Sequence, residues 1–314
     1  MPRKIFIVLT FTLFYSNYFY SQNTNKNSWK RQRHEVFFGI GAANFLGDLG
    51  GRDQVGKDYS YADLELSLTR PSATIGHRYR LTRNFAVRTD FNYMKLWGDD
   101  QLTSETYRNN RNLHFKSNIF ELSTHIEFAY YFGDLGNRYH IKNTFSRRMK
   151  SYNHYIYIFQ GVGVFYYNPK AKYQGSWVAL QPLSTEGQGL PGGPKKYRRI
   201  SFSLPLGIGY RITLQRKYSI GIEYSFRKTF TDYIDDVSTT YYDKNLLLQY
   251  KGPVAVALAD PSLGVIPTAT MPNADGSGAQ RGDNEYDSFM SVEFKFGYIL
   301  DNKLRKRKTT RAKF

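Results

Sequence analysis

The chain has 314 residues, no cysteine and a formal net charge of +18. The lack of cysteine excludes a disulfide framework, a thiolate metal site and a lipidated cysteine anchor. Aromatic residues make up 17% of the chain, yet the mean hydropathy is −0.55, which is too polar for a bundle of membrane helices. Because aromatic rings with a polar edge favour membrane interfaces, this combination favours strands that alternate lipid-facing with polar residues.

Residues 1–21 have the order of a secretory signal peptide. Arg3 and Lys4 precede an uncharged apolar and aromatic run over residues 5–20, and Ser21 offers a small residue for cleavage. An uncleaved anchor is the alternative, but the run is shorter than the roughly 20 residues that span a bilayer. We therefore predict cleavage after Ser21 and a basic periplasmic segment over residues 22–33.

Eight segments with period-2 alternation follow, as is typical of strands with one apolar and one polar face. In residues 200–213, for example, Phe202 and Leu204 alternate with Ser201 and Ser203. Residues 155–168 change face near Gln160, which predicts a β-bulge. The eight predicted strands cover residues 34–44, 72–81, 85–97, 118–132, 155–168, 200–213, 218–227 and 287–300.

The connections between these segments alternate in length. Long polar stretches cover residues 45–69, 98–117, 169–199 and 231–286, and shorter ones cover 82–84, 133–154 and 214–217. A soluble β-sandwich is the alternative, but its strands average about 5–6 residues, whereas these are long enough to cross a bilayer at a tilt. The pattern predicts an all-β fold over residues 34–300. We expect an eight-stranded antiparallel transmembrane β-barrel with long extracellular loops and basic periplasmic turns and tails.

The positive charge is concentrated at one predicted end of the barrel. The short turns, residues 22–33 and the basic periplasmic tail at 301–314 hold nearly all of the net charge, whereas the last long loop is acidic. With both termini in the periplasm of a cell with an outer membrane, this predicts a basic rim that meets lipid head groups or an acidic protein, and no nucleic-acid groove. The predicted partner-binding residues are Arg138, Lys142, Arg147, Arg148, Lys150, Arg216, Lys217, Lys303, Arg305, Lys306, Arg307 and Lys308.

Side chains fill the interior of an eight-stranded barrel. The predicted inward positions hold six acids and six bases, and buried charges are tolerated only when they are paired. We expect a structural ion-pair network, with a proton or substrate path as the alternative. The predicted lumen residues are Glu35, Arg78, Arg80, Arg88, Asp90, Glu121, Glu127, Arg211, Glu223, Arg227, Glu293 and Lys295.

No catalytic constellation is evident in the sequence. The six histidines form no spaced ligand motif, and there is no phosphate-binding loop or nucleophile elbow. His114 and Ser117 fall together near the outer rim, but nothing supplies a third catalytic partner. The sequence therefore predicts a protein that is not an enzyme and that carries no cofactor.

The densest carboxylate run contains Asp232, Asp235 and Asp236. Calcium takes several oxygen ligands, but the spacing does not match an EF-hand loop. A solvated or hydrogen-bonded loop base is favoured, and a calcium site is the alternative. Residues 254–271 are unusually apolar for a loop, which predicts either a partner surface or a segment that folds back over the barrel mouth.

Four motifs in chain order resemble the PorG-like outer-membrane barrels of the type IX secretion system. They are GIGAANFLGDLGG at 39–51, YYNPKA at 166–171, LGIGYR at 206–211 and GIEYSFRKTFTDYIDDVSTTYY at 221–242. The resemblance covers about residues 34–300, and it departs from the family in the longer last loop and the basic tail.

That resemblance implies a non-enzymatic component of the type IX protein secretion machine. Such a barrel would anchor the periplasmic ring complex, formed by a PorK-like lipoprotein and a PorN-like protein, to the outer membrane. Two alternatives stay open: a small outer-membrane barrel that handles a small molecule or lipid, and a surface adhesin that acts through its long loops.

Overall fold

A computed structural model describes seven stretches of the chain. The predicted signal peptide at 1–21, the segment 22–27 and the predicted tail at 301–314 lie outside the described residues, as do most of the connections at 50–67 and 133–152. The described residues are 28–49, 68–103, 106–132, 153–214, 217–264, 280–283 and 285–300.

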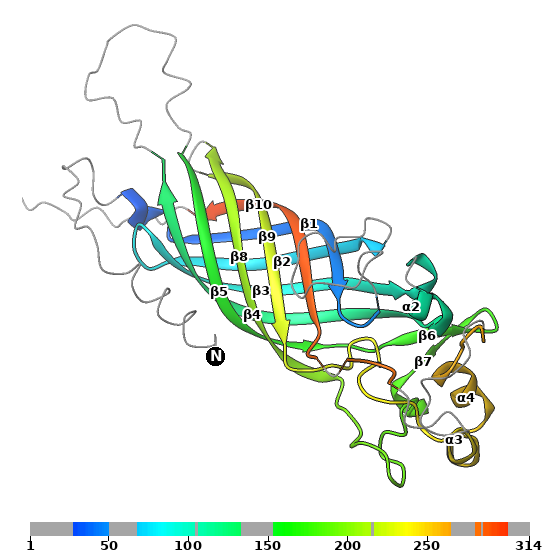
Figure 1. Cartoon of the computed structure of the whole chain (residues 1–314). Helices are drawn as coiled ribbons and strands as arrows, with labels where there is room; N and C mark the ends of the chain where they lie inside the picture. The colour runs from blue at the N-terminus through cyan, green and yellow to red at the C-terminus, as the bar shows by residue number, and fades with distance from the viewer. Residues whose placement is uncertain are drawn as a thin grey trace, which may run out of the picture.

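Eight long strands form a closed antiparallel barrel (Figure 1). Each strand pairs with its neighbours in the chain, the first pairs with the last, and the β3–β4 pairing is one of the eight that complete the ring. The barrel strands are β1 (His34–Leu46), β2 (Arg70–Arg80), β3 (Phe85–Asp99), β4 (His114–Tyr131), β5 (Asn153–Tyr166), β8 (Ile200–Leu214), β9 (Tyr218–Thr229) and β10 (Ser288–Leu300).

All eight strands expected from alternation are present, so the predicted fold class is confirmed. Their ends differ from the prediction by at most four residues, the largest difference being at the start of β4, His114 instead of residue 118. The alternation of apolar and polar residues predicts these strands because every strand of a closed barrel has one lipid-facing and one lumen-facing side.

The outward face of the barrel is an apolar belt. In β8, Ile200 and Phe202 are about 60% exposed, whereas Ser201 and Ser203, which alternate with them, are buried in the lumen. Similar exposed apolar residues lie on every barrel strand, among them Ile40 on β1 and Phe294 on β10. An apolar surface of this extent around a closed barrel is what a lipid bilayer covers, so the chain is a transmembrane barrel of the outer-membrane type.

Strand β5 corrects one prediction, because it contains no bulge. Gln160 pairs with Leu206 and Gly163 pairs with Ser203, and both pairs belong to one uninterrupted register. The pairing lapses only between them, opposite Pro205, which has no N–H to donate. Alternation is intact as well, but most aromatic residues of β5 point into the lumen and Gln160 points outward.

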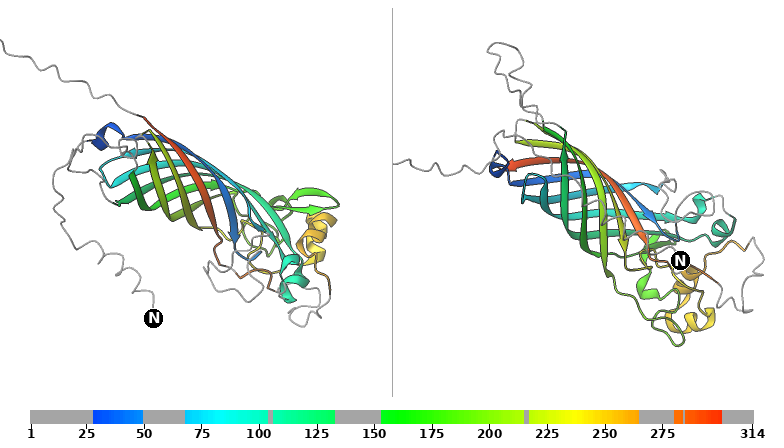
Figure 2. Two further views of the ribbon diagram at one scale, coloured as in Figure 1. Left: turned by 90° about the horizontal axis from the view of Figure 1, so that it is seen from above. Right: turned by 60° about the vertical axis from the view of Figure 1, so that its left-hand side comes forward.

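The two ends of the barrel differ (Figures 1 and 2). At one end, here called the turn end, lie both ends of the barrel chain, the 3-10 helix η1 (Ser28–Arg31) and the connections β2–β3, β4–β5 and β8–β9. At the other, the loop end, the long connections fold into structure of their own. No helix within the described residues has both the length and the apolar character that crossing a membrane would need.

The long connections carry seven short elements at the loop end, most of them visible in Figure 1. A hairpin continues the sheet beyond β4, because β6 pairs with β4 and β7 pairs with β6. The elements are η4 (Asp100–Leu102), α2 (Thr106–Arg111), β6 (Lys170–Tyr173), β7 (Ser176–Ala179), η6 (Gln181–Leu183), α3 (Lys244–Lys251) and α4 (Pro253–Ala259), of which η4 follows β3 directly.

Candidate functional site

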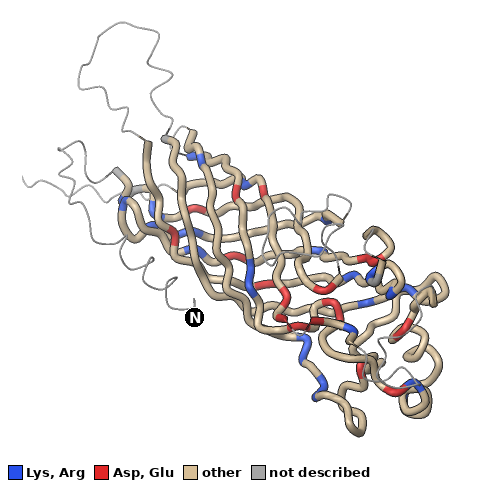
Figure 3. Tube along the Cα trace, in the orientation of Figure 1, with Lys and Arg blue, Asp and Glu red and all other residues tan. Residues whose placement is uncertain are grey.

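The lumen is filled with charged side chains over the half nearer the turn end. All twelve predicted lumen residues are buried. Figure 3 shows basic and acidic positions in blue and red along the barrel strands. Arg78 on β2 contacts two acids, Glu35 Oε2 at 2.8 Å and Glu127 Oε2 at 2.9 Å. Ser219 also donates to Glu35. Each of these charges therefore has a partner from another strand.

A second cluster is centred on Arg88 of β3. Its guanidinium lies 2.6 Å from Glu223, 2.8 Å from Asp90 and 3.3 Å from Glu127. Lys295 on β10 also contacts Glu223, at 2.6 Å. Cations from two strands thus share one carboxylate, and removing one partner of such a buried pair typically costs about 3–5 kcal/mol.

Nearer the loop end, the ion pairs give way to carboxylates held by neutral donors. Arg227 lies 2.7 Å from Glu121, which also accepts hydrogen bonds from Ser203 and Asn92. Thr74 donates to Glu293 at 2.7 Å. These hydroxyl and amide donors satisfy the carboxylate oxygens that the cations do not reach.

Aromatic side chains on β5 complete the network, and the sequence analysis did not include them. Arg211 donates to the hydroxyls of Tyr155 and Tyr157, each at 3.1 Å, and Tyr157 donates to Glu223 at 2.7 Å. Arg88 lies 4.4 Å from the ring centre of Phe159, a cation–π distance. Their signal in the sequence is the run of aromatics at every second position of residues 155–159.

Above this charged layer, the loop end of the lumen is closed by an apolar layer. It joins inward residues of five barrel strands to Ile234 and Val237 of the loop after β9. Phe115 is fully buried there, with its ring edge-on to Phe45 at 4.8 Å between centres. The first part of the long loop after β9 therefore inserts into the barrel mouth and packs against its wall.

All three residues of the predicted loop motif are buried. Asp235 accepts hydrogen bonds from the backbone N–H groups of Leu49 and Val237. Asp236 accepts from the hydroxyls of Thr185 and Tyr197, both at 2.5 Å. Asp232 is only 6% exposed, and neither of its carboxylate oxygens has a hydrogen-bond partner. The prediction of a hydrogen-bonded loop base is therefore correct for Asp235 and Asp236 but not for Asp232.

Other loop-end groups are paired across distant parts of the chain. Arg281, just before β10, contacts Glu186 at 3.0 Å and donates to the main-chain oxygen of Asp236. Arg111 at the end of α2 donates to Asp100 at 2.8 Å and to the main-chain oxygen of Asp48 at 2.8 Å. These contacts join the four long connections into one cap.

Several carboxylates of the cap have raised pKa values. Burial raises the pKa of Asp48 to about 7, with repulsion from Asp283 adding to the effect. Burial raises the pKa of Asp232 to about 8, and the nearby Ser238 hydroxyl opposes this only in part. Asp235 and Asp287 shift in the same direction, again chiefly through burial. These carboxyl groups therefore keep their protons to higher pH than exposed carboxyl groups do.

Residues 18–179 match the model of a protein family described as a domain of unknown function, DUF6089. The match covers just over half of the chain and includes β1 to β7. The chain belongs to the DUF6089 family. No curated protein shows a significant match to the sequence.

Three solved structures with a similar fold are distant in sequence from this DUF6089 barrel. Neisserial surface protein A is 8% identical, with 85% of this chain and 96% of that chain covered and a TM-score of 0.32. Ail, the attachment invasion locus protein of Yersinia pestis, bound to the heparin analogue sucrose octasulfate, is 10% identical, covers 85% and 98%, and has a TM-score of 0.31. The outer membrane protein OprG of Pseudomonas aeruginosa is 10% identical, covers 85% and 96%, and has a TM-score of 0.31.

The predicted partner-binding residues of this DUF6089 barrel fall almost entirely outside the described residues. Lys217 is the exception, exposed in the β8–β9 turn at the turn end. Arg33 and Arg83, also basic, lie at the same end, beside Tyr79 and Tyr131 respectively. The other predicted residues belong to the connections at 133–152 and 215–216 and to the tail at 301–314.

His114 and Ser117 do not form a catalytic pair in the DUF6089 barrel. They lie on opposite faces of β4, with Ser117 buried in the lumen. Ser117 accepts a hydrogen bond from the backbone N–H of Asn168, and His114 accepts one from that of Lys172. Both side chains hold the β6–β7 hairpin against the barrel rim.

The described part of the apolar segment, residues 254–264, folds back onto the cap. Leu258 and Val254 of α4 pack against Ala171 and Leu180 of the loop between β5 and β8. Leu263 remains 54% exposed. Residues 265–271 of this predicted segment lie outside the described residues.

Proposed function

We propose that this barrel is a non-enzymatic outer-membrane component of the type IX protein secretion machine and anchors the periplasmic ring complex to the outer membrane. One observation carries the proposal that it is an anchor: the lumen is filled along its length, first by ion pairs and then by the apolar layer. A transported molecule would have to displace both layers. The protein therefore acts through its surfaces.

The motif resemblance to PorG-like barrels identifies the partners in this proposal as a PorK-like lipoprotein and a PorN-like protein. The turn end is the surface that meets them, because both ends of the barrel chain and the basic connections belong to it. A concentration of positive charge attracts acidic protein surfaces and anionic lipid head groups over roughly a Debye length. In this arrangement the loop end faces the cell exterior.

The structured loop cap supports a second candidate, a surface adhesin. The cap exposes Leu248, Tyr250 and Leu263, each about half exposed, on elements held together by several hydrogen bonds. Exposed apolar residues on an ordered surface suit a protein contact. A handler of small molecules or lipids receives no such support, since the lumen of the described barrel offers no open path.

Co-purification after gentle solubilisation tests the anchor. Arg147→Glu, Arg148→Glu and Lys150→Glu, combined with removal of residues 303–314, should reduce recovery of the ring proteins at least fivefold at low salt, because the attraction becomes repulsion. The matched control reverses three exposed charges at the opposite end, Lys195, Lys196 and Arg198, and should leave recovery unchanged.

Unchanged recovery with the turn-end variant would contradict the proposed contact. Loss of recovery in the loop-end control alone would favour the cap as the binding surface. Deletion of the barrel should also stop export of cargo by the secretion machine, whereas an adhesin would leave export intact.

A further inference from the structure

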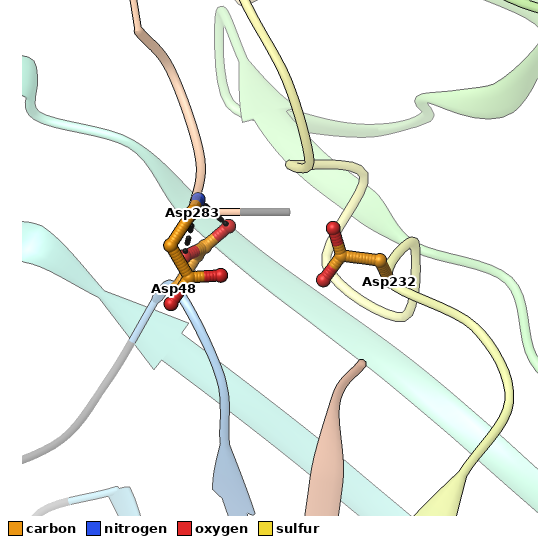
Figure 4. Close-up of side chains that lie close together, drawn as sticks. All are labelled: Asp48, Asp232 and Asp283. Carbon is orange, nitrogen blue, oxygen red and sulfur yellow. Dashed lines mark hydrogen bonds between the residues drawn. The ribbon is translucent and has the colours of Figure 1, made fainter. Parts of the chain in front are cut away.

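Three carboxylates from separate parts of the chain meet at the loop end (Figure 4). Asp48 follows β1, Asp232 follows β9 and Asp283 precedes β10, and one oxygen atom from each lies within 4.8 Å of the others. Asp283 donates its backbone N–H to the carboxylate of Asp48 at 3.2 Å, which fixes these two side by side. Asp232 faces them from across the gap.

Asp232 is the independent sign that this cluster receives a ligand. Asp232 is only 6% exposed, yet neither of its carboxylate oxygens has a hydrogen-bond partner. Its neighbours Asp235 and Asp236 both accept hydrogen bonds. A buried carboxylate without a donor is costly, so this position favours a bound proton or a group that supplies positive charge.

No side chain of the described residues supplies that charge. None of the ion pairs in this part of the chain includes the carboxylate of Asp48, Asp232 or Asp283. Arg108 and Arg111 both pair with Asp100, and each donates to the main-chain oxygen of Asp48.

We propose that Asp48, Asp232 and Asp283 together bind one divalent cation, and that calcium is the ion that fits. Calcium binds oxygen ligands at about 2.3–2.6 Å, so two ligands on opposite sides of the ion are about 4.8 Å apart. The spacing of the three carboxylates lies within this limit. The cluster contains no histidine or cysteine, as expected for a hard cation. Asp283 is exposed, which leaves room for water to complete the coordination shell.

The bound ion would link three connections that enter and leave the barrel at different strands. It would hold the loop after β9 in the barrel mouth, where Ile234 and Val237 complete the apolar layer. In the sequence, only Asp232 of the run 231–236 belongs to this site. The other two ligands come from 184 residues before it and 51 residues after it.

Calcium titration of the mature chain tests the site. The chain is refolded in synthetic detergent, free of lipopolysaccharide, and stripped with a chelator before calorimetric titration with calcium chloride. The wild type should bind one ion per chain, and Asp232→Asn and Asp283→Asn should each weaken binding at least tenfold. The matched control is Glu285→Gln, an exposed acid two residues from Asp283 that should bind as the wild type does.

Two features make the outcome decisive. Asp283 is exposed, so Asp283→Asn removes a ligand without disturbing a buried side chain. Calcium should also slow proteolysis of the loop after β9 in the wild type and in Glu285→Gln, but not in the two ligand variants. The site would be overturned if the wild type showed no saturable binding, or if both ligand variants bound calcium as tightly as the wild type does. The choice of calcium would be overturned if the wild type bound magnesium as tightly as calcium.

Discussion

The two halves of the interior are equally buried but differ in chemistry. Toward the turn end, acids and bases from different strands pair at distances of 2.6–2.9 Å. Toward the loop end, an apolar layer is followed by a cap in which Asp48, Asp232 and Asp283 have no cationic partner among the described residues. Ion pairs therefore dominate the half that the strands line, whereas the loop end combines ion pairs with a cluster of carboxyl groups that form none.

The half that the strands line is therefore fixed, whereas the half that the loops form responds to its surroundings. Barrel strands hold their side chains in one register, so each ion pair is set by the pairing of backbones and cannot be exchanged easily. Loops bring together residues far apart in sequence, and here they gather carboxylates. The paired charges of the strands stabilise the barrel, whereas the carboxyl groups without a cationic partner make the cap sensitive to protons and cations.

The largest effect is expected from Arg88→Met in the charged half. The substitution leaves Glu223 and Asp90 buried without their main cation, so the free energy of unfolding should fall by about 3–5 kcal/mol. Urea unfolding in lipid vesicles, followed by tryptophan fluorescence, measures this change. Arg198→Met, at an exposed loop arginine, should change stability by less than about 0.5 kcal/mol.

A double substitution separates the ion pair from simple loss of packing. Arg88→Met combined with Glu223→Gln should cost less than the sum of the two single changes, because the second removes the charge that the first leaves unpaired. Additive costs would show that the pair is not coupled and would remove the distinction between the two halves.

The charged half could be predicted from the sequence because the strand period assigns each residue to a face. A charge such as Arg88 or Glu223 cannot face lipid, so alternation alone assigns it to the lumen. Strand β5 is an exception to this rule. Most of its aromatic side chains face inward, where some contact arginines, whereas Gln160 faces outward. Hydrophobicity does not distinguish an aromatic ring that meets lipid from one that meets a guanidinium.

The loop end could not be predicted in the same way. Asp48 and Asp283 are separated from Asp232 by many residues, and no periodicity relates them. Their meeting depends on how irregular connections pack, for example on the backbone hydrogen bond from Asp283 to Asp48. The acidic run at 231–236 therefore indicated where carboxylates gather but not which of them act together.

A smaller effect is expected from Phe115→Ala in the apolar layer. Phe115 is fully buried against Phe45, so its truncation should cost about 3 kcal/mol and should loosen the loop end before the rest of the barrel. Hydrogen exchange should increase in the cap and remain unchanged at the turn end. The control, Leu102→Ala at a half-exposed position of the cap, should cost less than about 1 kcal/mol. Uniform loss of protection along the barrel would show that the two halves unfold as one.

The smallest effect is expected from protons at Asp236. Burial raises its pKa to about 6, with Glu186 adding to the shift, while Arg281 and the hydroxyls of Thr185 and Tyr197 oppose it. Because the folded carboxyl keeps its proton to higher pH than the unfolded one, the stability of the cap should fall as pH rises from about 4 to about 6.

Asp236→Asn should reduce this decline between about pH 4 and 6 and should leave the pH dependence above 6 unchanged, since other carboxylates of the cap titrate there. Hydrogen exchange of cap peptides in the presence of a chelator, corrected for the intrinsic rate at each pH, measures both ranges. The turn end should show no such difference, because its charges are paired. Identical pH profiles in the variant and the wild type would mean that the cap does not open separately from the barrel, and the contrast between the two halves would then be one of composition alone.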